Sequence, residues 1–128
     1  MEYTKGIKAL LDANSDVSAA VSNRIYPITA PQGAALPFIV YDVISTNTIH
    51  SKDALEHTMA RIEVVAYSNS YSEAVTIGRY MQDALNRQSY NSGGIVIDAL
   101  FTSDLEIEQI EDPSRYAFVL ELEAFIPE

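Results

Sequence analysis

A capping box followed by one apolar stripe predicts a helix over residues 71–87. In Ser70-Tyr71-Ser72-Glu73, the Ser70 hydroxyl and the Glu73 carboxylate are placed so that each accepts from the other residue's free backbone amide. Small and apolar side chains then recur at helical spacing, at Ala74, Val75, Gly78, Met81 and Leu85. Such a stripe has to be buried, so the flanking segments must supply the surface against which it packs.

Pairs of predicted strands flank this helix on both sides. Residues 38–45 are rich in β-branched and aromatic side chains, and residues 61–67 partly alternate between apolar and polar. After the helix we expect a third strand over 95–102, an acidic loop over 104–114, and a last strand over 116–126. In that last strand one face carries Phe118, Leu120, Leu122, Ala124 and Ile126.

The N-terminal part predicts two short helices, over roughly 3–13 and 16–22, with Ser15 as the N-cap of the second and Asp16 in its first turn. The element order is then α-(α)-β-β-α-β-β. We expect an α+β fold with a mainly antiparallel sheet of about four strands and helices packed on one face. At 128 residues and 14.1 kDa, the chain fits one domain, 1–128.

Composition excludes several classes of protein. Without cysteine there is no disulfide scaffold, thiolate zinc site or cysteine nucleophile. The net charge of −10 argues against binding nucleic acid by charge attraction. The apolar stretches at 38–41 and 116–120 are far shorter than the roughly 20 residues of a membrane span. Met1–Leu11 also lacks the apolar run of a signal peptide, so we expect synthesis in a cytoplasm and no passage through a membrane.

The negative charge is concentrated at the C-terminal end. Residues 98–128 carry nine acids against Arg115, whereas residues 1–97 have a net charge of only −2. The segment is either a solvated acidic edge, a surface facing something negative, or a dock for a basic partner. The candidate lumen- or partner-facing acids are Asp104, Glu106, Glu108, Glu111, Glu121 and Glu123.

No residue set for catalysis is present in recognisable form. Glycine-rich phosphate-binding motifs and a Gly-x-Ser-x-Gly elbow are missing. The pair Glu121 and Glu123 is better explained as solvated or interfacial than as an acid and base. Residues 46–58 form a long loop or the tip of an extended hairpin, and a segment of this length is a candidate interaction loop through His50, Lys52, Asp53, Glu56 and His57. Its histidines and acids are suitable metal ligands, but a surface loop explains them better. We expect no enzyme activity, cofactor or metal.

One stretch resembles a known family. Arg24-Ile25-Tyr26-Pro27, followed by Ala30-Pro31-Gln32-Gly33-Ala34-Ala35-Leu36-Pro37-Phe38-Ile39-Val40-Tyr41, is similar to the signature of the tail-completion (tail terminator) proteins of long-tailed phages and prophages. The resemblance continues through the strand at 61–67, the helix that opens with Tyr71-Ser72-Glu73-Ala74, and the closing strand at 116–125. It extends over nearly the whole chain.

The resemblance implies a structural role in the virion, in the neck region of the tail. It implies a ring, usually of six copies, that ends polymerisation of the tail tube and joins the tail to the head connector. The expected partners are other copies of the chain, the tail tube protein and a head-completion or connector protein. An acidic lumen would let DNA pass without specific binding. The alternatives are another neck component, such as a head-completion or stopper protein, and a small ligand-binding α+β domain.

Overall fold

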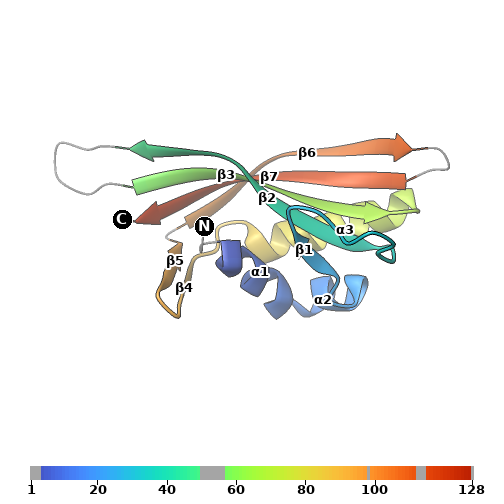
Figure 1. Ribbon diagram of the computed structural model, residues 1–128, viewed down its shortest axis with the longest axis horizontal. Helices are drawn as coiled ribbons and strands as arrows, with labels where there is room; N and C mark the ends of the chain where they lie inside the picture. Colours follow the sequence, from blue (N-terminus) through green and yellow to red (C-terminus); the bar gives the residue numbers. More distant parts are fainter. Residues whose placement is uncertain (1–3, 50–56, 98, 112–114, 128) are drawn as a thin grey trace.

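The computed structural model describes residues 4–49, 57–97, 99–111 and 115–127. Its three helices are α1 (Thr4–Ala13), α2 (Ser15–Val21) and α3 (Tyr71–Leu85). Its strands are β1 (Ile25–Pro27), β2 (Phe38–Ile49), β3 (His57–Ser68), β4 (Tyr90–Ser92), β5 (Ile95–Ile97), β6 (Ala99–Glu111) and β7 (Arg115–Pro127). Figure 1 shows the long strands as one layer, with all three helices on the same side of it. None of the described helices has the length and apolar character needed to span a membrane.

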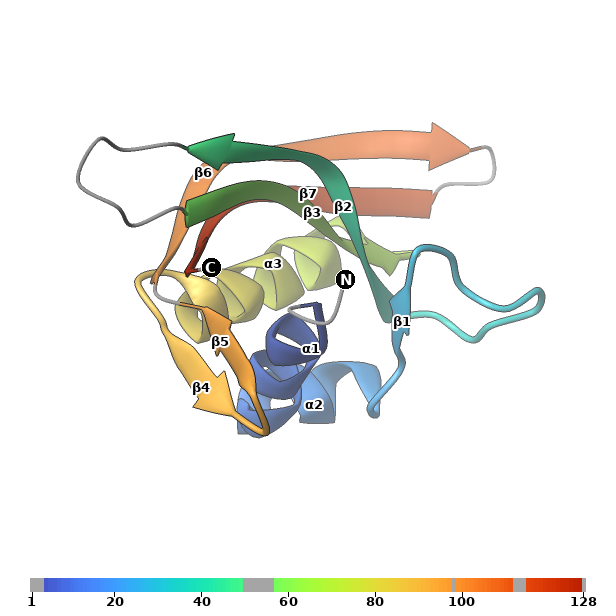
Figure 2. The same ribbon diagram turned by 60° about the vertical axis from the view of Figure 1, so that its left-hand side comes forward.

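The long strands form a mainly antiparallel sheet in the order β1-β2-β3-β7-β6. The four long strands β2, β3, β7 and β6 pair antiparallel, and the short edge strand β1 pairs parallel with β2. A separate β4–β5 hairpin lies beside α1 (Figure 2). The α+β class and the mainly antiparallel sheet are therefore confirmed, and the sheet has one more strand than the four expected.

The core lies between the helices and the face of the sheet that they cover. The alternation predicted for the last strand holds, because Phe118, Leu120, Leu122 and Ala124 are all buried in one cluster with residues of α1, α2 and α3. The helix α3 crosses β7 closely at Gly78, where a Cβ atom would lie 2.2 Å from Cδ1 of Phe118. A glycine is required there because the helix backbone rests directly on the aromatic ring.

The caps of two helices differ in detail from those predicted. Asn14, not Ser15, is the N-cap of α2, and its side-chain oxygen accepts from the Val17 amide at 3.1 Å. At α3, Ser70 Oγ accepts from the Glu73 amide as expected. The Glu73 carboxylate instead accepts a 2.6 Å hydrogen bond from the hydroxyl of Ser68. Ser68 is fully buried, and its hydroxyl oxygen accepts from the Ser70 amide. Glu73 is therefore linked to the Ser70 amide through the Ser68 hydroxyl, rather than accepting from that amide directly as in a standard capping box.

Two strand predictions were wrong. The segment 104–114, expected to be an acidic loop, continues as strand β6 as far as Glu111, paired with β7. The single strand expected over 95–102 is divided into β5 and the first residues of β6. The physical reason is that Leu105 and Ile107 alternate with acids and lie opposite the core residues Leu120 and Phe118. In the segment 46–58, β2 continues to Ile49 and β3 begins at His57, paired with it. Of the two alternatives for this segment, the extended hairpin is therefore correct. Residues 50–56 lie outside the described part.

Candidate functional site

The candidate site is the face of the sheet opposite the helices, which we call the outer face (Figure 1). In the described part of the chain no helix lies on it. By strand alternation it carries Arg61, Glu63, Val65 and Tyr67 of β3, and the register places Phe38 and Val40 of β2 and Val119, Glu121 and Glu123 of β7 beside them. The outer face is therefore apolar towards one end and charged in its middle.

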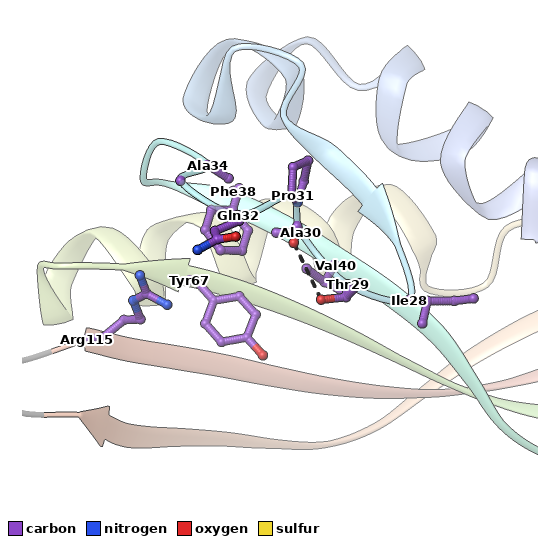
Figure 3. A pocket seen from close by; sticks show the side chains of 11 residues that line it. Ile28, Thr29, Ala30, Pro31, Gln32, Ala34, Phe38, Val40, Tyr67 and Arg115 are labelled. Atoms are coloured by element: carbon purple, nitrogen blue, oxygen red, sulfur yellow. Dashed lines mark hydrogen bonds between the residues drawn. The ribbon is translucent and has the colours of Figure 1, made fainter.

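At the apolar end, the loop between β1 and β2 encloses a hollow of about 440 Å³. The hollow is bounded by loop residues 28–34 and by the side chains of Phe38, Val40, Tyr67 and Arg115 (Figure 3). The rings of Phe38 and Tyr67 lie with centroids 5.1 Å apart, which gives the hollow an aromatic wall. In Figure 3, Arg115 and Ile28 lie at opposite ends of this hollow.

Arg24 holds this loop against the sheet. Its Nε atom donates to the Pro37 carbonyl at 3.0 Å and its Nη2 atom donates to the Leu36 carbonyl at 3.4 Å. The Arg24 carbonyl accepts from the Ile39 amide at 2.9 Å. The same residue thus binds the end of the loop through its side chain and the start of β2 through its backbone, which explains why an arginine precedes the Ile25-Tyr26-Pro27 strand.

Ile28 begins the loop in a strained conformation. Its φ of 67° lies in the region that β-branched residues rarely adopt, and the Thr29 amide donates to the Pro27 carbonyl at 2.7 Å across it. This is a three-residue turn of the uncommon positive-φ type. The Ile28 amide is fixed by the Tyr41 carbonyl at 2.8 Å, while the side chain is 70% exposed. The backbone therefore holds a large apolar side chain in solvent at an energetic cost.

The middle of the outer face is acidic. Arg61 forms an ion pair with Glu121, with Nη2 and Oε2 3.0 Å apart. The register places Glu63 opposite Glu121 and Arg61 opposite Glu123. Three acids and one base therefore share this part of the outer face, and Glu121 and Glu123 lie there together as the alternation of the last strand requires.

The other predicted site residues are placed less completely. Asp104, Glu106, Glu108 and Glu111 belong to the edge strand β6, where Glu106 pairs with Val119 and Glu108 with Ala117. His57 is the first residue of β3 and lies opposite Pro127 in β7. The remaining members of the interaction loop, His50, Lys52, Asp53 and Glu56, lie outside the described residues. Among the residues that are described, no group of three His, Cys, Asp or Glu side chains is arranged to hold a metal ion.

The sequence did not predict the hollow. The position of a loop over a sheet depends on contacts from elsewhere in the chain, which the residues of the loop itself do not reveal. The available signal was Arg24, whose long side chain donates to the Leu36 and Pro37 carbonyls of this loop.

Two solved structures share the fold of this chain. A chain in the virion of a native gene transfer agent (GTA) particle is 13% identical, with a TM-score of 0.76 over 95% of this chain and 92% of that one. A second solved structure is 11% identical, with a TM-score of 0.54 over 98% of this chain and 95% of its own. At such identities these likenesses show the fold alone. No curated protein matches the chain.

The family model described as tail completion protein gp17 matches residues 5–126. That match includes every described strand and helix except for the terminal residue or so at each end. The chain belongs to the tail completion protein gp17 family, a family of structural virion proteins of phage tails rather than of enzymes.

Proposed function

We propose that this protein is a tail terminator: a subunit of a ring, usually of six copies, at the head-proximal end of the tail tube. The ring stops polymerisation of the tube and joins the tail to the head connector. The observation that carries the proposal is the family match over residues 5–126, which includes the whole sheet and all three helices apart from Thr4 and Pro127.

The shape of the sheet supports a protein that contacts partners on two sides. The β2–β3 hairpin and the β6–β7 hairpin lie at opposite ends of the sheet (Figure 1). A ring between a tube and a connector has two partner-facing sides, and its subunits must also meet each other through two different surfaces. The interaction loop within the β2–β3 hairpin (His50, Lys52, Asp53, Glu56 and His57) is our candidate for one of these contacts.

The acids support a path for DNA. Our proposal places Glu121 and Glu123, with Asp104, Glu106, Glu108 and Glu111 of β6, at or near the lumen of the ring. Repulsion would then let a polyanion slide through without binding. Screening limits this effect to about 8 Å at physiological salt, so only acids close to the DNA path contribute.

Tail length separates a terminator from a stopper. A lysate that lacks this protein should contain overlong or irregular tubes and unjoined heads, because nothing ends polymerisation. If the protein were a head-completion or stopper component, tubes of normal length would accumulate beside heads that lose their DNA. Electron micrographs of the two kinds of particle decide the question, and normal tails on filled heads would refute both roles.

Charge reversal tests the lumen. We expect the double variant Glu121→Lys/Glu123→Lys to form tails but to bind DNA in a salt-sensitive way. The matched control is Asp83→Lys on α3, an exposed acid on the helical layer. If the double variant instead gives filled heads and finished tails that do not join, these acids dock a basic connector surface. If ejection and joining are both normal, the charge argument for a lumen fails although the family assignment stands.

A further inference from the structure

We infer that the hollow and the exposed Ile28 beside it bind a second copy of this chain in a head-to-tail contact. The surface, which we call the Ile28 patch, consists of Ile28, Thr29, Phe38, Val40, Tyr67 and Arg115. The inference rests on the proposed ring and adds which surface the subunits use to form it.

Backbone strain and exposure together indicate a binding role. Ile28 combines an unfavourable positive φ with a side chain that is 70% exposed, so neither its own backbone nor the core benefits from an isoleucine. Glycine would adopt the same φ without strain. Strained residues persist where the surroundings force them and occur preferentially at functional sites. An exposed apolar side chain next to an aromatic hollow is a surface that a partner can bury.

The charge of the patch identifies the chemistry of the partner. Arg115 is the charged residue among those lining the hollow and is the one base within 98–128, in a chain with 18 acids and 8 bases. No ion pair joins Arg115 to any acid whose side chain the structure describes. A partner segment that combines an apolar side chain with a carboxylate would fill the hollow and pair with this guanidinium. Another copy of the chain offers exposed carboxylates of this kind, such as those of Asp16, Asp42 and Asp83.

The same charge determines how two copies meet. A twofold contact that placed the patch on itself would bring two Arg115 guanidinium groups together, which costs free energy. A contact between the patch and a different, acidic surface of the next copy avoids this repulsion. Contacts between two different surfaces produce rings when the rotation closes. Binding along a DNA backbone requires several neighbouring cations, whereas Arg115 is the one cation lining the hollow. DNA is therefore excluded as the occupant.

Cysteine labelling provides a direct test, because the chain has no cysteine of its own. Thr29→Cys places one thiol at the hollow, and Thr76→Cys places a control thiol on the exposed side of α3. In rings made from this protein alone, we expect maleimide to react with the Thr29→Cys thiol at least about tenfold more slowly than in monomers, and with the control at an unchanged rate. Protection that appears only after tail tube protein is added would overturn the inference in favour of that partner, and no protection in any assembly would also overturn it.

Two substitutions with matched controls test the contacts themselves. We expect Ile28→Gly and Arg115→Glu each to weaken ring formation at least about tenfold, measured as native mass against protein concentration. Ile28→Gly should keep or raise the melting temperature, since it relieves the strained φ. The controls are Ile44→Ser, which removes another half-exposed isoleucine, and Arg79→Glu, which reverses an exposed charge on α3.

The outcomes distinguish this inference from the proposed function. Rings that form equally well with Ile28→Gly and Arg115→Glu overturn the Ile28 patch and leave the terminator proposal intact. A wild-type protein that never forms rings, alone or on purified tails, overturns the terminator proposal and this inference with it. Loss of rings in the two patch variants, with normal rings in both controls, supports the inference.

Discussion

Replacing Gly78 by alanine tests how closely α3 rests on the sheet. An added Cβ would lie 2.2 Å from Cδ1 and 2.3 Å from Cγ of Phe118. Carbon atoms make favourable contact at about 3.5–4.0 Å, so the ring or the helix must move by more than an ångström. Phe118 is only 4% exposed and packs in the main core cluster, which leaves its ring little room to rotate away.

Two opposing effects set the magnitude. Overpacking of a well-filled core costs about 1–3 kcal/mol, and the depth of this overlap places Gly78→Ala at about 3 kcal/mol. Alanine is a better helix former than glycine by about 1 kcal/mol. The net loss of unfolding free energy is therefore about 2 kcal/mol, which for a chain of this length lowers the melting temperature by about 7 °C.

The assay is urea and thermal unfolding of the wild type, Gly78→Ala, Phe118→Leu and the double variant. Phe118→Leu alone removes buried ring atoms and is destabilising. In the double variant the smaller leucine side chain makes room for the new methyl group. The loss of unfolding free energy in the double variant should therefore be smaller than the sum of the losses in the two single variants. This coupling is expected because the residues are in direct contact. A Gly78→Ala variant as stable as the wild type, or losses that simply add, would refute the close approach of α3 to β7.

Three further substitutions test separate features. Leu122→Ala should cost about 2–5 kcal/mol in urea unfolding, because Leu122 is 1% exposed beneath the helices; a change near zero would mean that the other face of β7 is buried. Asn14→Ala should cost about 1 kcal/mol by the same measurement, since it removes the α2 cap, and Ser15→Ala is the matched control with a smaller expected loss. Burial raises the pKa of Tyr41, Lys8 opposes this and Asp12 adds to it. The folded protein then holds the Tyr41 proton more tightly than the unfolded chain does. The unfolding free energy should therefore be at its full value below about pH 10 and should fall as the pH rises further. Tyr41→Phe should make this fall shallower, and equal slopes for the two proteins in alkaline urea titrations would contradict the prediction.

The parts of the fold that could be predicted from sequence are those decided by local pattern. Helix α3 has a cap and one apolar stripe, and β7 alternates without a break, so both were located to within two residues. The cap of α2 was missed by one position because Asn14 and Ser15 are equally good capping residues and only the backbone φ and ψ decide between them. The hollow was missed because it depends on Arg24 contacting a loop 12 and 13 residues away.

Strand β6 was missed because its acids suggested a solvated loop, and its formation gives some of these acids a regular spacing. In a loop, Glu106 and Glu108 would have no fixed spacing. In a strand, successive residues on one face are about 7 Å apart, which is shorter than the screening length of about 8 Å at physiological salt. The register pairs Glu106 with Val119 and Glu108 with Ala117, and opposite residues in an antiparallel pair share a face. These two positions therefore belong to the same outer face as Glu121 and Glu123. A ring that turned this face inward would bring Glu121 and Glu123 towards the proposed DNA path, and Arg61, which is paired with Glu121, would offset part of their charge.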